Sequence, residues 1–285
     1  MKLGFGSNVC RAIVRSAAGV IIEERVQHNM VLDQGRANIH GNGIFGTGSI
    51  THACAVGSSA QSITAATTQL NDEEARVVCG SRSMLWSGTG PGDNGESMIA
   101  SFSSGQVGGK TLHTWGFSHS DSAGANINTA GVFEDSGGSA SPIVVPSGAS
   151  LTLEYKFLIS AVGSGAGPIN ISGAGNFTDA TWSFLWSFGS NTLRSLSTVA
   201  GLGSGTVFLR ELSNLFAEAS FHAQADGQYG IRIAAEVQVS SPGECSHIDF
   251  LAAGTRFYAI NFGPAGGPTF SSGDVLSLGD LKISW

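Results

Sequence analysis

The sequence predicts an all-β protein, mainly antiparallel, built of two β-sandwich or jelly-roll-like units with an N-terminal arm and one short helix. Three observations lead to this fold class. Glycine accounts for 41 of 285 residues, about twice its usual share, and charged residues for only 12%, about half the common value. Several segments also alternate apolar and polar residues, which is the period of a half-buried strand.

The clearest of these strands covers residues 151–159, which follow a turn at Gly148. Every second residue is apolar, and polar residues fill the positions between: Leu151, Leu153, Tyr155, Phe157 and Ile159 against Thr152, Glu154 and Lys156. We expect further strands at residues 97–102, 112–117, 182–188, 231–239 and 281–285. Residues 208–219 carry apolar side chains at helical spacing, which predicts an amphipathic helix. Residues 23–35 fit either a strand or a short helix that stops at Gly35.

Composition also suggests how the chain is divided. A stretch rich in Gly and Ser cannot form a core and is typical of a linker. The expected parts are an N-terminal docking arm at residues 1–25, a β-sandwich domain at 26–160, a Gly/Ser linker at 161–176 and a second β-sandwich domain at 177–285. A weak internal repeat, Gly148-x-x-Leu151 and Gly273-x-x-Leu276, favours two units that each end in a similar strand, although chance similarity explains it almost as well.

The charge balance disfavours a dedicated nucleic-acid binder. The net charge is −7, whereas phosphate binding needs a basic face. Arg11, Arg15 and Arg25 form a local basic group in the arm, and we take them as candidate partner-binding residues.

No apolar run approaches the roughly 20 residues needed to span a bilayer. We therefore expect neither membrane insertion nor a signal peptide, and we expect the protein to be made in a cytoplasm.

The cysteines are too few and too scattered for a disulfide framework, and buried free thiols are the simpler interpretation. They are Cys10, Cys54, Cys79 and Cys245. His52 with Cys54, and Cys245 with His247, could each offer two metal ligands. Neither pair has the closely spaced partner pair of a structural zinc site, so we expect no metal and no other cofactor.

Residues 135–138, Asp-Ser-Gly-Gly, resemble the nucleophile loop of trypsin-like serine proteases, and His52 weakly matches their histidine motif. Glu134 and Ser139 depart from that loop pattern, and a tight turn explains the same residues. We therefore expect no catalytic residue.

Two aromatic features could instead contact a sugar, because flat rings stack on pyranose faces. Residues 182–188 place four aromatic side chains on one strand face, where core packing is the favoured interpretation. Trp86, beside a Gly-rich loop, is the candidate glycan contact.

Four segments carry a resemblance to a known group of proteins. They are residues 29–35 (Asn-Met-Val-Leu-Asp-Gln-Gly), 56–58 leading to 70–76, 127–133 (Ile-Asn-Thr-Ala-Gly-Val-Phe) and the turn and strand at 148–159. In this order they resemble the β-structured virion proteins of tailed bacteriophages found in tails, collars, fibres and head appendages. Thr129 replaces the usual acidic residue, and the second half has no comparable match, which leaves the virion location open.

The resemblance implies a structural component of a tailed-phage or phage-like virion, associated with the tail, collar or fibre and assembled in the host bacterial cytoplasm. Its partners would be copies of itself and neighbouring virion proteins, with a host-surface glycan as a further candidate. The alternatives are a head decoration or head-fibre protein, a carbohydrate-binding module, or a hydrolase. The arm at residues 1–25 would dock the protein, so its deletion should prevent incorporation and leave a folded chain.

Overall fold

The computed structural model shows a mainly antiparallel β protein, which confirms the predicted fold class. The chain forms two compact units. Unit 1 consists mainly of residues 161–285, and unit 2 of residues 5–85 and 92–160. The structure describes residues 2–5, 9–44, 48–85, 94–162, 164–166, 169–171, 175–177, 181–184, 199–211, 214–262 and 267–284.

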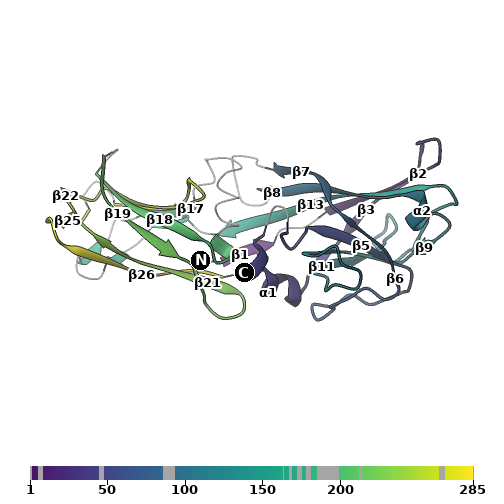
Figure 1. The fold of residues 1–285 in the computed structure, drawn as a ribbon, viewed down its shortest axis with the longest axis horizontal. Helices are drawn as coiled ribbons and strands as arrows, with labels where there is room; N and C mark the ends of the chain where they lie inside the picture. The colour runs from purple at the N-terminus through teal and green to yellow at the C-terminus, as the bar shows by residue number, and fades with distance from the viewer. Residues whose placement is uncertain are drawn as a thin grey trace. The chain divides into compact units, whose positions relative to one another are not determined.

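The first sheet of unit 2 has the strand order β3-β2-β13-β8-β7, and every neighbouring pair is antiparallel. These strands run side by side in Figure 1. Their bounds are β2 (Val9–Arg15), β3 (Ile21–His28), β7 (Gly80–Leu85), β8 (Asn94–Phe102) and β13 (Ser150–Val162).

The second sheet of unit 2 has the order β4-β11-β10-β5-β6 and is also antiparallel. Its strands are β4 (Met30–Val31), β5 (Ala53–Gly57), β6 (Glu73–Val78), β10 (Thr114–Ser118) and β11 (Thr129–Val132). A short pair, β9 (Thr111–Leu112) and β12 (Ile143–Val144), and the helices α1 (Asp33–Asn42) and α2 (Ser104–Val107) complete the unit.

Aromatic side chains join the two sheets of unit 2 face to face. Trp115 and Phe117 come from β10, and Tyr155 and Phe157 come from β13; all four are almost fully buried. The rings of Phe117 and Tyr155 stack with centroids 4.3 Å apart, and Trp115 meets Tyr155 edge-on at 5.9 Å. The burial of the apolar positions from Leu151 to Phe157 confirms the alternation predicted for this strand.

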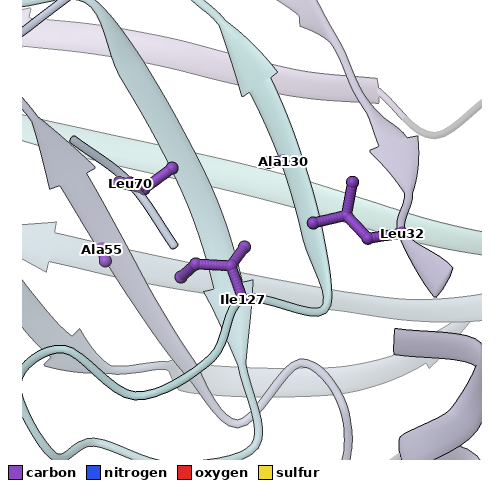
Figure 2. Close-up of a cluster of buried hydrophobic side chains, with 5 residues drawn as sticks. All are labelled: Leu32, Ala55, Leu70, Ile127 and Ala130. Carbon is purple, nitrogen blue, oxygen red and sulfur yellow. The ribbon is translucent and has the colours of Figure 1, made fainter. Parts of the chain in front are cut away.

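A smaller apolar cluster lies where the chain crosses from the first sheet to the second (Figure 2). Its members come from segments that are far apart in the sequence, and they are Leu32, Ala55, Leu70, Ile127 and Ala130. Leu32 stands between β4 and α1, while Ile127 and Ala130 belong to the segment around β11. Because β4 pairs with β11, this cluster fixes the position at which the chain enters the second sheet.

Asn128 forms hydrogen bonds beside this cluster through both its backbone and its side chain. Its carbonyl accepts a hydrogen bond from the Leu32 N–H (2.9 Å), and its side-chain Nδ2 donates to the Ile50 carbonyl (2.9 Å). Its Oδ1 accepts from Asn38 of α1 (2.7 Å). Gly35 of α1 packs directly on this residue: a Cβ at Gly35 would lie 2.1 Å from the Asn128 carbonyl oxygen. Only glycine allows this approach without a shift of the backbone.

Unit 1 contains a six-stranded antiparallel sheet with the order β14-β17-β24-β23-β18-β19. Its strands are β14 (Ser164–Ala166), β17 (Thr181–Phe184), β18 (Ser204–Glu211), β19 (Asn214–His222), β23 (His247–Ala252) and β24 (Thr255–Asn261). The rings of Phe221, Phe250 and Phe257, from β19, β23 and β24, lie close together with centroids 6.4 to 6.5 Å apart.

The other strands of unit 1 form smaller groups. β21 pairs antiparallel with β20 and β26, and β1 pairs parallel with β26. β15 pairs with β16, and β22 with β25. The bounds are β1 (Lys2–Phe5), β15 (Ile169–Ile171), β16 (Gly175–Phe177), β20 (Gln224–Ala225), β21 (Gly230–Gln238), β22 (Gly243–Glu244), β25 (Thr269–Phe270) and β26 (Val275–Ser284).

The N-terminal segment 1–25 differs from the expected docking arm. β2 lies inside the first sheet of unit 2, between β13 and β3, and its side chains from Ala12 to Val14 are buried. Three of the apolar residues that look scattered in the sequence, Cys10, Ala12 and Val14, pair with Tyr155, Leu153 and Leu151 on the inward face of this sheet. The strand β2 is therefore part of the core.

Three other parts of the chain also differ from expectation. The helix predicted at residues 208–219 is wrong: β18 and β19 form an antiparallel pair there. Their inward residues, among them Leu209 and Ala217, only mimic helical spacing because two alternating strands follow one another closely. The helix α1 runs through Gly35 rather than stopping there. In place of the linker expected at 161–176, the described residues include β14 and β15 and the start of β16, all within unit 1.

The weak sequence repeat corresponds to two similar turns. Gly148 and Gly273 both have positive φ angles, 77° and 94°. Each turn is closed by a backbone hydrogen bond, from Ala149 N–H to the Pro146 carbonyl and from Asp274 N–H to the Ser271 carbonyl. Each then leads into a long strand, β13 or β26.

Deletion of residues 1–25 is expected to unfold unit 2, because it removes β2 and exposes the inner edge of β13. Thermal unfolding followed by circular dichroism should lose the transition of this unit, leaving at most that of unit 1. A truncated chain with an unchanged melting profile would show that β2 is dispensable, as a docking arm would be.

The variant Gly35→Ala is expected to lower the free energy of unfolding by about 2 kcal/mol, because the added methyl group overpacks against the Asn128 backbone. The matched control is Gly105→Ala in α2, where a Cβ meets only the Ser103 hydroxyl at 3.9 Å. Helix propensity alone favours Ala over Gly by about 1 kcal/mol at both sites. Urea titration of both variants measures the difference, and equal stabilities would contradict the packing argument.

Candidate assembly surface

The strand β3 is the outer strand of the first sheet of unit 2 on one side. A turn joins it to β2, with the Ser16 N–H donating to the Val20 carbonyl (2.9 Å) and Gly19 at a φ of 78°. Along one edge β3 pairs with β2. In the described part of the chain no strand pairs with its other edge, so a row of backbone N–H and C=O groups faces outward there.

Exposed apolar side chains concentrate on this strand and the residues beside it. Nine large apolar residues are exposed among those that the structure describes, and five of them lie between positions 20 and 30. Their exposed fractions are 62% for Val20, 43% for Ile21, 49% for Ile22, 54% for Val26 and 44% for Met30. Burying a half-exposed Val or Ile completely would contribute roughly 1 kcal/mol, so this row favours a contact with another surface.

The outward face of the β2–β3 hairpin carries a three-member ion-pair group. The guanidinium of Arg11 on β2 donates to both carboxylate oxygens of Glu24 on β3 (2.7 and 2.8 Å) and to Glu154 on β13 (3.0 Å). The hydrogen bond from Arg11 lowers the pKa of the Glu24 carboxyl. Such exposed pairs contribute little stability, but they hold both charges in place on the sheet surface.

The opposite face of β3 is fastened to the segment that follows β11. Arg25 donates to the Ser141 carbonyl (2.8 Å) and to Glu23 (2.6 Å from Nε). The buried side chain of Gln27 accepts a hydrogen bond from the Glu134 N–H (2.6 Å) and donates to the Glu134 carbonyl (3.2 Å). These contacts fix β3 from the inner side and leave its outward edge in a set position.

The three arginines predicted to bind partners do not form one basic surface. Arg11 is neutralised by acidic partners on the outer face, and Arg25 points to the inner face with Glu23. Arg15 lies at the end of the hairpin, where it approaches the Gly19 carbonyl (3.4 Å). The unpaired edge of β3, rather than the positive charge of these arginines, therefore distinguishes this surface.

A cavity of about 330 Å³ lies beside β3 and contains the groups that the protease-like loop suggested. It is lined by Glu24, Arg25, Val26, His28, Glu134, Asp135, Ser136 and Gly138. His28 Nδ1 lies 3.1 Å from the Glu134 carboxylate, so an acid and a histidine share the cavity with Ser136. The described residues lining it do not include His52.

The loop after Ser136 has no free donors to stabilise an oxyanion. The Gly137 and Ser139 N–H groups donate to the Asp135 carboxylate (2.8 and 3.0 Å), and the Gly138 N–H donates to the Asp135 carbonyl. The backbone bonds from Ser139 and Gly137 lower the pKa of Asp135. Acyl transfer needs such donors aimed at the reacting carbonyl, so the loop has the geometry of the tight turn that explains its sequence.

The sequence-predicted metal ligands are used in other ways. Among the residues described, no three His, Cys, Asp or Glu side chains gather as a metal site requires. Cys245 donates to the His247 carbonyl (3.3 Å), and His247 lies against Ser246 and Asp249. All four cysteines are buried free thiols, as predicted.

No helix in the described ranges has the length and apolar character needed to cross a membrane.

The aromatic candidates for sugar binding cannot be placed. Trp86 lies outside the described residues, as do residues 185–188 of the predicted aromatic stripe.

The row of exposed residues at 20–30 was missed from the sequence, although its signal was present. Ile22, Glu24, Val26 and His28 alternate with Glu23, Arg25 and Gln27, which indicates a strand. Treating residues 1–25 as an arm divided that strand between two parts of the chain.

Comparison with known proteins gives no match. No protein-family model, no curated protein and no solved structure is significantly similar to this chain.

The native thiols are expected to be nearly inert in the folded protein. Burial raises the pKa of Cys79 and of Cys245 to about 12, and raises that of Cys10 and Cys54 well above the usual value. A rise of about three units from the ordinary value lowers the thiolate fraction at pH 8 about a thousandfold. Titration with a thiol-specific chromogenic disulfide should detect four thiols in denaturant and almost none without it; rapid reaction of the native chain would contradict this burial.

Proposed function

We propose that this protein is a structural component of a tailed-phage or phage-like particle and that it acts through protein–protein contacts, with β3 as its docking strand. The observation that carries the assembly role is the concentration of exposed apolar residues along an unpaired sheet edge. The particle setting rests on the resemblance of residues 29–35 and 127–133 to phage virion proteins.

An open edge suits this role because its backbone groups offer ready-made hydrogen bonds to an extended partner segment. Isolated edges of this kind promote unwanted association, and natural proteins usually protect them with charges, prolines or irregular backbone. Edge pairing obtains affinity from the backbone and selectivity from alternate side chains. On β3 the selective side chains would be Ile22, Glu24 and Val26, which share the outward face.

Two of the four segments that carry the phage resemblance have a structural role in this proposal. Residues 29–35 contribute β4 and the start of α1, and residues 127–133 contribute β11 and its flanks; β4 and β11 pair with each other. They therefore build the support that holds β3, and catalytic chemistry is not required of them. A host-surface glycan is a second proposed partner, with Trp86 as its candidate contact.

The variant Val26→Lys is expected to reduce incorporation into particles about tenfold or more, because a charge must then be buried at the docking edge. Val144→Lys is the matched control, since Val144 has a similar exposed fraction of 57% against 54% but lies on β12. Incorporation is measured by mass spectrometry of density-gradient-purified particles from cells that express each variant.

Two results would count against the proposal. Absence of the wild-type chain from purified particles would remove the virion role. Equal incorporation of both lysine variants would leave the particle setting in place and exclude β3 as the docking strand. Circular dichroism of both variants verifies that each remains folded.

A further inference from the structure

From Glu23 to His28 the edge strand β3 pairs with β2 in unbroken register; at its start the register shifts between Val14 and Arg15 of β2, which leaves Ile22 as the extra residue on β3. On the far side of the same sheet, β7 is distorted: its register with β8 shifts between Gly80 and Ser83, and Ser81 has a positive φ of 45°. In the second sheet, Arg76 on the outer strand β6 donates to the carbonyls of Ser120 and Ala125, so a neighbouring loop covers that strand. Irregular or covered edges resist pairing with another strand. The edge of β3 has neither protection between Glu23 and His28.

We propose that the partner of β3 is a second copy of this chain, paired antiparallel through β3 about a two-fold axis at Glu24. This inference rests on the proposed assembly function and names the partner. In a symmetric antiparallel pair the two-fold axis is perpendicular to the sheet, and residues directly opposite one another lie on the same face. Their residue numbers must therefore add up to an even number, which leaves only axes that pass through a residue.

An axis at Glu24 makes the strand complementary to itself. Ile22 then lies opposite Val26 of the other copy, and Glu23 lies opposite its Arg25; each contact occurs twice by symmetry. Apolar pairs and opposite-charge pairs are the favourable cross-strand combinations. The exposed row on β3 is thereby covered by its own counterpart.

The same axis places the two Glu24 side chains opposite each other. Each of them already accepts two hydrogen bonds from Arg11 of its own copy. At the centre of the contact each Glu24 carboxylate would therefore already be bound to a guanidinium group, which it shares with Glu154. Without Arg11 the two carboxylates would repel each other.

Neighbouring axes fit less well. An axis at Arg25 would place two guanidinium groups opposite one another and set Glu24 against Val26. An axis at Val26 would leave only residues 24–28 to pair, because the chain passes after His28 to β4 in the second sheet. An axis at Glu24 aligns residues 21–27 of the two copies, which is all of β3 except His28 and includes the register shift at Ile22.

Cysteine cross-linking of the full-length chain tests both the partner and the register. Opposite residues in an antiparallel pair have Cα atoms roughly 4.5 to 5.5 Å apart, which is within disulfide reach. The variant Glu24→Cys should therefore form a covalent dimer when the oxidant diamide converts two thiols into one disulfide. The native cysteines are buried and should not contribute.

The matched control is Val26→Cys, on the same strand and the same face. In the proposed register, position 26 of one copy lies four residues along the strand from position 26 of the other, a separation of roughly 13 Å. Val26→Cys should therefore cross-link at least about tenfold more slowly than Glu24→Cys. A mixture of Ile22→Cys and Val26→Cys chains should give a mixed disulfide. The wild-type chain should sediment at twice its mass of 29.2 kDa.

The outcomes separate the inference from the proposed function. A monomeric wild-type chain, together with Glu24→Cys that reacts no faster than the control, overturns the pairing; faster cross-linking by Val26→Cys alone overturns the assigned register. A monomer that still enters particles leaves the virion role intact. A dimer that is absent from particles supports the pairing and rejects the virion role.

Discussion

The buried side chain of Asn128 joins parts of unit 2 that are distant in the sequence. It bonds to Asn38 of α1 and to the Ile50 carbonyl, while its backbone carbonyl holds Leu32. Because a buried polar group left without a partner costs about 1 to 3 kcal/mol, this network admits few alternative arrangements. Gly35 allows α1 to approach closely enough for the bonds to form. The geometry of the crossing between the two sheets follows from these contacts.

That crossing is also what leaves β3 at the edge of its sheet. The chain must leave the first sheet after His28 so that β4 can pair with β11 beside Asn128. On its inner face β3 is then held by Arg25 and Gln27, whose side chains bond to the backbone of residues 134–141. A strand fastened in this way loses little conformational entropy when a partner adds to it. The proposed docking edge is thus preorganised by the same contacts that close the unit.

Period-2 patterns predicted this fold well where a strand has one buried and one solvated face, as in residues 151–159 and 231–239. They failed where two short strands follow each other: Leu209 lies before the β18–β19 connection and Ala217 after it, and together they imitate helical spacing. The arm prediction failed because the pairing of β2 with β13 joins residues that are far apart in the sequence: Arg15 pairs with Ser150, 135 positions later. Local composition carries no information about such a contact. The alternation of residues 22–28 indicates a strand, but it does not show that the strand lies at a sheet edge, since this depends on which strands lack neighbours.

The outer strands of the first sheet of unit 2, β3 and β7, differ in regularity, and this difference limits how many copies could associate through the sheet. When two identical edges pair about a two-fold axis, neither copy has this edge left for a further partner, so the assembly stops at a dimer. Continued growth would require a second open edge on the same sheet. The distortion of β7 at Ser81 and Gly80 makes that edge a poor template. An edge that keeps its register from Glu23 to His28 and a distorted edge at β7 therefore favour a closed pair over a filament, and larger assembly would have to use other surfaces of the chain.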